Sequence, residues 1–149
     1  MAIQRTFAML KPGVLSRRLA GEIIARLERK VFDIVGMKLM RVHRAQAEEH
    51  YAEHREKSFF GELVDYMTSG PVVAMVLEGD NAVRLLRTIC GSTKADEACP
   101  GTIRGDYAMH TGLNIIHASD SVESAGREID LFFKPEELIG WKDGNDDWI

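Results

Sequence analysis

One histidine of the sequence stands where it could act as a nucleophile. His117 follows the apolar residues 113–116, which predict a short strand, and precedes a predicted helix. Glu128 lies on that helix and could bond one imidazole nitrogen, which leaves the other nitrogen free to attack. A lone histidine in such a place is more often structural, so pattern alone makes His117 no more than a candidate.

Three cationic side chains from separate segments could bind phosphate: Lys11, Arg87 and Arg104. Each alone is typical of a solvated surface charge. Together they suit polyphosphate, because guanidinium groups match phosphate oxygens bidentately and lysine adds a compact charge. Thr93 adds a hydroxyl donor. With neither a Walker-type loop nor a Gly-x-Gly-x-x-Gly motif, a nucleotide would be held by side chains from scattered elements.

Two further histidines, His50 and His54, are one helical turn apart and could ligate a metal from one face. No third ligand stands out. The favoured interpretation is therefore an exposed helix surface.

Apolar periodicity predicts the elements that position these residues. Strands are predicted at 5–10, 35–40, 72–77 and 113–116, and helices at 19–27, 46–54, 59–67, 82–89 and 120–132. Residues 72–77 are apolar on both faces, which indicates a central strand. In 35–40, Val35, Met37 and Leu39 alternate with less apolar residues, as in a strand with one better-buried face. The order predicts an α+β fold: a ferredoxin-like βαββαβ sandwich with a four-stranded antiparallel sheet, added helices and a C-terminal tail.

Composition narrows the class of protein. The 149 residues are 45% hydrophobic and 28% charged, which is typical of a single globular domain spanning 1–149. The formal charge of −4 makes nucleic acid unlikely as the main ligand. The longest apolar run is far shorter than the ~20 residues that span a bilayer, and the N-terminus does not resemble a signal peptide. We therefore expect a cytoplasmic protein without a membrane partner, with Cys90 and Cys99 reduced.

Several motifs in order along the chain resemble those of the nucleoside diphosphate kinase family. They are Lys11-Pro12, Gly21-Glu22-Ile23-Ile24, His50-Tyr51, Ser69-Gly70-Pro71-Val72-Val73-Ala74-Met75, Pro100-Gly101-Thr102-Ile103-Arg104-Gly105-Asp106 and Asn114-Ile115-Ile116-His117-Ala118-Ser119-Asp120-Ser121. The segment around His117 is highly specific. Departures occur as well: Arg18 stands where a glycine is common, Ala95 where a proline is often seen, and Thr111 where valine is frequent.

The resemblance implies ping-pong transfer of the γ-phosphoryl group from a nucleoside triphosphate, usually ATP, to a nucleoside diphosphate. The carrier would be a phosphohistidine at His117, with Mg²⁺ on the nucleotide phosphates and no metal ligand from the protein. Glu128 would support the histidine from behind, and Arg87, Thr93 and Arg104 would contact phosphates. Lys11 and Asn114 would meet the sugar and phosphate region, Tyr51 would lie beside the histidine, Ser119 would support the site, and Phe59 would stack on the base. By pattern alone, Phe59 is as well explained by core packing.

The family is oligomeric, and the tail with Trp141 and Trp148 resembles that of hexameric members, so a homohexamer is favoured over a tetramer. Two alternatives stay open. One is a ferredoxin-like binding module without catalysis, and the other is an inactive family member that serves as an oligomeric scaffold.

Overall fold

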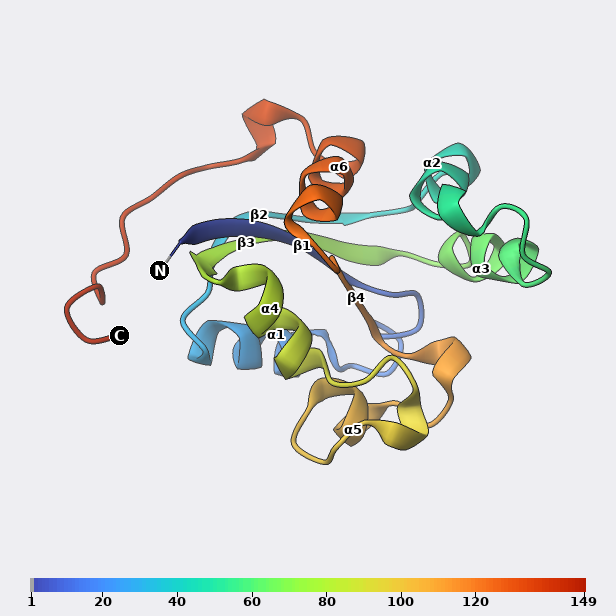
Figure 1. Cartoon of the computed structure of the whole chain (residues 1–149), viewed down its shortest axis with the longest axis horizontal. Coiled ribbons are helices and arrows are strands. Elements are labelled where there is room, and N and C mark those ends of the chain that lie inside the picture. Colours follow the sequence, from blue (N-terminus) through green and yellow to red (C-terminus); the bar gives the residue numbers. More distant parts are fainter. Residues whose placement is uncertain (1) are drawn as a thin grey trace.

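The computed structural model, which describes residues 2–149, places a four-stranded sheet between two layers of helices (Figure 1). Its strands are β1 (Ile3–Leu10), β2 (Asp33–Met40), β3 (Val72–Asp80) and β4 (Ile116–Ala118). The order is β2-β3-β1-β4, and every neighbouring pair is antiparallel. This arrangement confirms the predicted α+β fold of ferredoxin-like type.

Alternating side chains of the central strands supply both cores. Phe7 and Met9 of β1 belong to one apolar cluster, whereas Ala8 and Leu10 belong to the other. The first cluster is covered by α2 (Arg44–His50), α3 (Phe60–Met67) and α6 (Val122–Phe132), and the second by α1 (Ala20–Arg29) and α4 (Ala82–Cys90) (Figure 1). Among residues 2–149, no helix has both the length and the apolar character required to cross a membrane.

Short elements occupy the connections. They are a five-residue helix, α5 (Ile103–Tyr107), and four single 3-10 turns: η1 (Ala52–His54), η2 (Ala95–Glu97), η3 (Thr111–Leu113) and η4 (Pro135–Glu137). The predicted strand at 113–116 is therefore wrong in its bounds. Ile115 has φ of +76°, which interrupts the extended backbone, so pairing with β1 begins only at Ile116. His117 consequently lies inside β4 and not after its end.

The start of α6 also differs from the prediction. Ser121 is the N-cap residue, and its hydroxyl accepts a hydrogen bond of 3.0 Å from the Ser124 backbone N–H. The helix that carries Glu128 thus begins directly after the strand that carries His117. This short connection brings the two side chains into contact.

The edge strand β2 departs from its expected pattern. A β-bulge between Ile34 and Gly36 changes which side chains face inward, and Met37 and Leu39 are 52% and 66% exposed. The C-terminal tail runs along this strand, because Ile139 N–H donates to Val35 O at 2.8 Å. A β-carbon at Gly36 would lie 2.9 Å from Leu138 Cδ2 and 3.2 Å from the Phe133 ring, so a larger residue there would require these side chains to shift.

Candidate active site

The predicted nucleophile and its carboxylate partner are in direct contact. His117 Nε2 lies 2.6 Å from Glu128 Oε2, the carboxylate is buried, and the imidazole is 22% exposed. An ionised carboxylate only accepts hydrogen bonds, so the bond places the imidazole proton on Nε2. Nδ1 therefore keeps its lone pair, as a nucleophile requires.

The surroundings keep this imidazole neutral. Burial, together with the positive charges of Lys11, Arg104 and Arg87, holds the pKa of His117 far below its usual value. Burial also raises the pKa of Glu128, while a hydrogen bond from the Ser119 hydroxyl opposes that rise. Ser119 itself is fully buried. The pair thus combines a neutral imidazole with a hydrogen-bonded carboxylate.

Lys11 reaches the site from the end of β1. Its ammonium donates to Asn114 Oδ1 at 2.7 Å, and its backbone N–H donates to Ile115 O at 2.9 Å. The turn that follows Lys11 is compatible with this placement. Gly13 and Arg18 both have positive φ, of 97° and 60°, so Arg18 adopts the conformation that a glycine would adopt with less strain.

Arg104 is a buried cation held by backbone carbonyls. Its guanidinium donates to Asn114 O at 3.2 Å, Gly91 O at 2.8 Å and Ile116 O at 2.5 Å, and the residue is 3% exposed. Five N–H donors in a rigid fork allow several carbonyls to be bound at once. Arg104 therefore ties the stretch before His117 to the end of α4 and adds a positive charge to the site.

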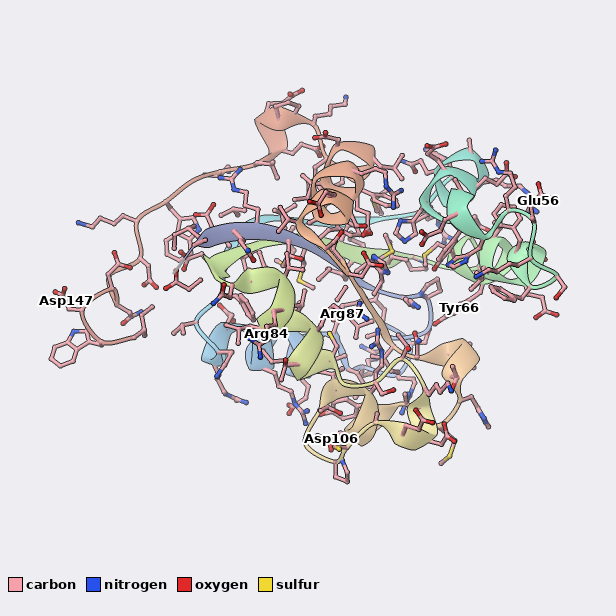
Figure 2. The ribbon with its side chains drawn as sticks, in the orientation of Figure 1. Glu56, Tyr66, Arg84, Arg87, Asp106 and Asp147 are labelled. Atoms are coloured by element: carbon pink, nitrogen blue, oxygen red, sulfur yellow. The ribbon has the colours of Figure 1, made fainter. Side chains whose placement is uncertain are left out.

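Arg87 extends from the last turn of α4 toward β4 (Figure 2). Its Nη1 donates to Ala118 O at 3.1 Å, next to His117. Thr93 contributes a backbone carbonyl, which accepts a hydrogen bond of 3.3 Å from Asn114 Nδ2. Two arginines and one lysine are thereby gathered around one imidazole.

These residues line one cavity of about 210 Å³. It brings together eight of the ten predicted site residues: Lys11, Tyr51, Arg87, Thr93, Arg104, Asn114, His117 and Glu128. A wider hollow of about 680 Å³ lies beside it and shares Arg87 and Asp120, but it contains neither His117 nor Glu128. We therefore place the candidate active site in the smaller cavity.

Ser119 and Phe59 are the two predicted residues outside that lining. Ser119 supports Glu128 from within the fold, as described above. Phe59 is 43% exposed, whereas its neighbour Phe60 packs against the apolar cluster of α2, α3 and α6. Phe59 is thus not a core residue, and its ring is 5.7 Å from that of His54, a residue that lines the cavity.

The sequence predicted that His50 and His54 lie on an exposed helix surface, and this prediction is wrong for His50. Its residue is 4% exposed, and its Nδ1 lies 3.8 Å from Glu128 Oε2. In the described part of the chain, the one group of three possible metal ligands within 4.8 Å consists of His50, His117 and Glu128, without His54. The spacing of buried Ala47 and His50 on α2 could have revealed the buried face. Sequence reasoning considered His54 only as a possible metal ligand and did not single out Asp120 or Arg127, and all three line the cavity.

Two departures from the family pattern compensate for each other in the loop after α4. The Ala95 backbone N–H donates to the Thr111 hydroxyl at 3.0 Å. A proline at 95 has no N–H, and a valine at 111 has no hydroxyl. This bond holds the loop that carries Thr93 to the segment before β4.

The side chains of the site do not form a binding site for a divalent cation by themselves, so such an ion would be carried on phosphate oxygens. Hard cations such as Mg²⁺ prefer oxygen ligands and retain several waters, so the group of two imidazoles and one carboxylate does not match them. Glu128 is moreover bonded to His117. Asp120, whose pKa is lowered by a hydrogen bond from Ser124, is an ionised carboxylate in the cavity wall.

Because of Lys11, nucleotide binding should vary with pH in the alkaline range. Burial and the charge of Arg104 lower its pKa to about 8, so the free protein loses this charge as pH rises through about 8. A phosphate bound beside Lys11 would restore the charge, so binding at pH 9 should take up a proton. Calorimetry in two buffers of different ionisation enthalpy measures this uptake. The Lys11→Met variant should show none, and an absence of uptake in the unsubstituted protein would contradict the assignment.

The chain is similar to known proteins over nearly its whole length. Residues 4–138 match the family model described as nucleoside diphosphate kinase. Relatives named nucleoside diphosphate kinase include one from Archaeoglobus fulgidus, 56% identical over 99% of this chain and 97% of its own length, and one from Treponema pallidum, 55% identical over the full length of both. Among solved structures, the Halobacterium salinarum nucleoside diphosphate kinase in complex with CDP has a TM-score of 0.96 at 48% identity and covers 99% of this chain and 98% of its own.

Proposed function

The chain belongs to the nucleoside diphosphate kinase family, and from this premise we propose that His117 is the residue that carries the phosphoryl group. The chain is a phosphotransferase that acts on nucleotides and moves the γ-phosphoryl group from a triphosphate to a diphosphate. The observation that supports His117 is its 2.6 Å bond to Glu128, which leaves Nδ1 unprotonated beside three cations.

In the first half-reaction, the Nδ1 lone pair attacks the γ-phosphorus. The new P–N bond forms while the bond from phosphorus to the β,γ-bridging oxygen breaks, and its electron pair leaves with the diphosphate. Positive charge develops on the ring, and Glu128 stabilises it through Nε2–H. A second diphosphate then takes the phosphoryl group by the reverse steps, and His117 returns to its neutral form.

The cations act on the phosphate charge. Lys11, Arg87 and Arg104 neutralise oxygens of the transferring and leaving groups, and an arginine in this role is worth about 10³–10⁵ in rate in other phosphoryl-transfer enzymes. The hydroxyl of Thr93 donates to phosphate. Asn114, which accepts a hydrogen bond of 2.7 Å from Lys11, would meet the sugar hydroxyls.

Three further residues complete the proposed site. Tyr51 lines the cavity beside His117, and Ser119 supports Glu128. Phe59 stacks on the nucleobase, for which an exposed ring is required, and stacking suits every base because each has a π-face. We take ATP as the usual donor.

Transfer within this family requires a divalent cation, and Mg²⁺ is the ion we propose. It would be held by the nucleotide phosphates and water, and Asp120 adds an ionised carboxylate to the cavity wall. When bound, the ion neutralises phosphate charge and helps to align the reacting groups.

Initial-rate kinetics test the proposed function. A carrier residue requires a ping-pong scheme, so double-reciprocal plots against the donor at several acceptor concentrations should be parallel. Lines that intersect would indicate direct transfer between two bound nucleotides and would contradict a phosphohistidine.

We further propose a homohexamer. Exposed apolar side chains gather on the edge strand and the tail, where Met37, Leu39, Trp141 and Trp148 are all more than half exposed. Light scattering should give six times the chain mass of 16.7 kDa. A mass of one, two or four chains would refute the hexamer.

Residues 1–149 are proposed to act as one domain, since the family model matches residues 4–138. The proposed compartment is the cytoplasm. Both cysteines, Cys90 and Cys99, are free thiols, which suits a reducing environment.

A further inference from the structure

A second histidine sits behind the candidate nucleophile and has no role in the mechanism above. His50, at the C-terminal end of α2, has a side chain that is 2% exposed. Among the described residues, neither of its ring nitrogens has a hydrogen-bond partner. An unpaired polar atom in the core is costly, and most buried polar groups are hydrogen-bonded, so this imidazole calls for a partner.

The nearest acceptor is the carboxylate that holds His117. His50 Nδ1 lies 3.8 Å from Glu128 Oε2, the same oxygen that His117 Nε2 contacts at 2.6 Å. The two imidazole rings meet edge to face, with centroids 4.6 Å apart. Rings of Phe7 and Phe132 lie near the His50 ring, with centroids 6.4 and 5.4 Å away.

We propose that His50 is a positioning residue for phosphoryl transfer, which donates its Nδ1–H to Glu128 Oε2 as His117 accepts the phosphoryl group. The proposal rests on the roles of His117 and Glu128 given under the proposed function. A distance of 3.8 Å is too long for a hydrogen bond, but catalytic hydrogen bonds are often long before substrate binds and shorten in the reacting complex. Two donors on one oxygen would fix the carboxylate while positive charge grows on His117.

The charges around the pair agree with a neutral donor at His50. Burial, followed by the effect of His117, lowers its pKa to about 3, so the ring carries one proton at neutral pH. Lys11 after β1 and Arg127 on α6 also oppose a positive His50, while Glu128 favours it. Burial raises the pKa of Glu128, the charge of Arg127 lowers it, and the charge of Asp120 after β4 raises it.

Two substitutions at His50 separate donation from packing. His50→Leu removes the N–H, whereas the amide nitrogen of His50→Asn occupies about the place of Nδ1 and can still donate. We expect His50→Leu to slow phosphorylation of His117 by about tenfold to a hundredfold, as is common when an orienting partner is removed. The acid limb of the pH–rate profile should also move to higher pH by about one unit, because Glu128 loses a hydrogen-bond donor that favours its ionised form. His50→Asn should recover most of both effects.

Phe132→Leu is the matched packing control, because it weakens the same aromatic cluster without removing a hydrogen-bond donor. Its rate and pH profile should stay within about twofold and a few tenths of a unit of the unsubstituted protein, as expected for a residue outside the site. A His50→Leu protein that matches the unsubstituted one, or a His50→Asn protein as impaired as His50→Leu, would overturn the proposal. So would equal impairment of Phe132→Leu.

A measurement on the unsubstituted chain avoids any failure to fold. With ¹⁵N-labelled histidine, NMR should show His50 as the Nδ1–H tautomer and His117 as the Nε2–H tautomer. An Nε2–H tautomer at His50 would overturn its role as donor to Glu128. If His117 itself is not phosphorylated by a nucleoside triphosphate in the unsubstituted protein, the proposed function fails instead, so the two failures are distinguishable.

Discussion

Substitution of His117 by glutamine is expected to lower transfer between nucleotides by at least about four orders of magnitude, because loss of a nucleophile leaves only positioning and charge neutralisation. The amide nitrogen of glutamine lies near the place of Nε2, so it can still donate to Glu128. The carboxylate at 3% exposure is therefore not left without a partner. The atom that is lost is Nδ1.

Nucleotide affinity provides the control for this variant. Because Lys11, Arg87 and Arg104 hold their places through bonds to Asn114 and to backbone carbonyls, phosphate binding should change only a few-fold. Transfer is measured by a coupled assay and affinity by calorimetry. Retention of more than one-hundredth of the original rate would contradict a role of His117 as the carrier.

Substitution of Glu128 by glutamine should lower the phosphorylation rate by about 10²–10⁴, as replacement of the acid that orients a catalytic histidine does elsewhere. The neutral amide cannot stabilise positive charge on the ring. It can also donate to Nε2, which would place the imidazole proton on Nδ1 and remove the lone pair. The single-turnover rate should fall, while the concentration of nucleotide at half-saturation stays about the same.

Glu123 offers a matched control for this substitution. It lies in the first turn of the same helix, α6, and is exposed, so Glu123→Gln makes the same chemical change away from the site. Its rate should equal that of the unsubstituted protein. A Glu128→Gln rate within twofold of normal, or an equal loss in Glu123→Gln, would show that the carboxylate behind His117 is not required.

The fold was largely predictable because its strands carry simple signals. Residues 72–77 are apolar on both faces, and they form most of the central strand β3, whose side chains enter both clusters. The failures lie where local backbone geometry overrides periodicity. Positive φ at Ile115 delays β4, and the β-bulge before Gly36 exposes Met37 and Leu39. Neither feature has a signal in hydrophobic alternation.

Most residues of the candidate site could be named from the sequence, but the contacts between them could not. His117 and Glu128 are joined by one strand end and two turns of helix, so their meeting follows from the order of elements. By contrast, the three carbonyl bonds of Arg104 depend on how η3 and α4 converge. The burial of His50 depends on packing of α2 against α6, which joins segments distant in sequence.

The two alternatives to an active kinase were a binding module without catalysis and an inactive oligomeric scaffold. Membership of the nucleoside diphosphate kinase family removes the independent binding module. An inactive scaffold would have no need for a carboxylate 2.6 Å from a neutral imidazole beside three cations. The retained geometry therefore favours catalysis.

The most direct test of the account is to isolate the protein after brief exposure to ATP labelled at the γ-phosphate, without an acceptor. The label should be stable in base and labile in acid, should reside on Nδ1 of His117, and should leave on addition of a nucleoside diphosphate. The His117→Gln variant should take up none. Label that persists in this variant, or that resists discharge by a diphosphate, would contradict a phosphohistidine carrier at His117.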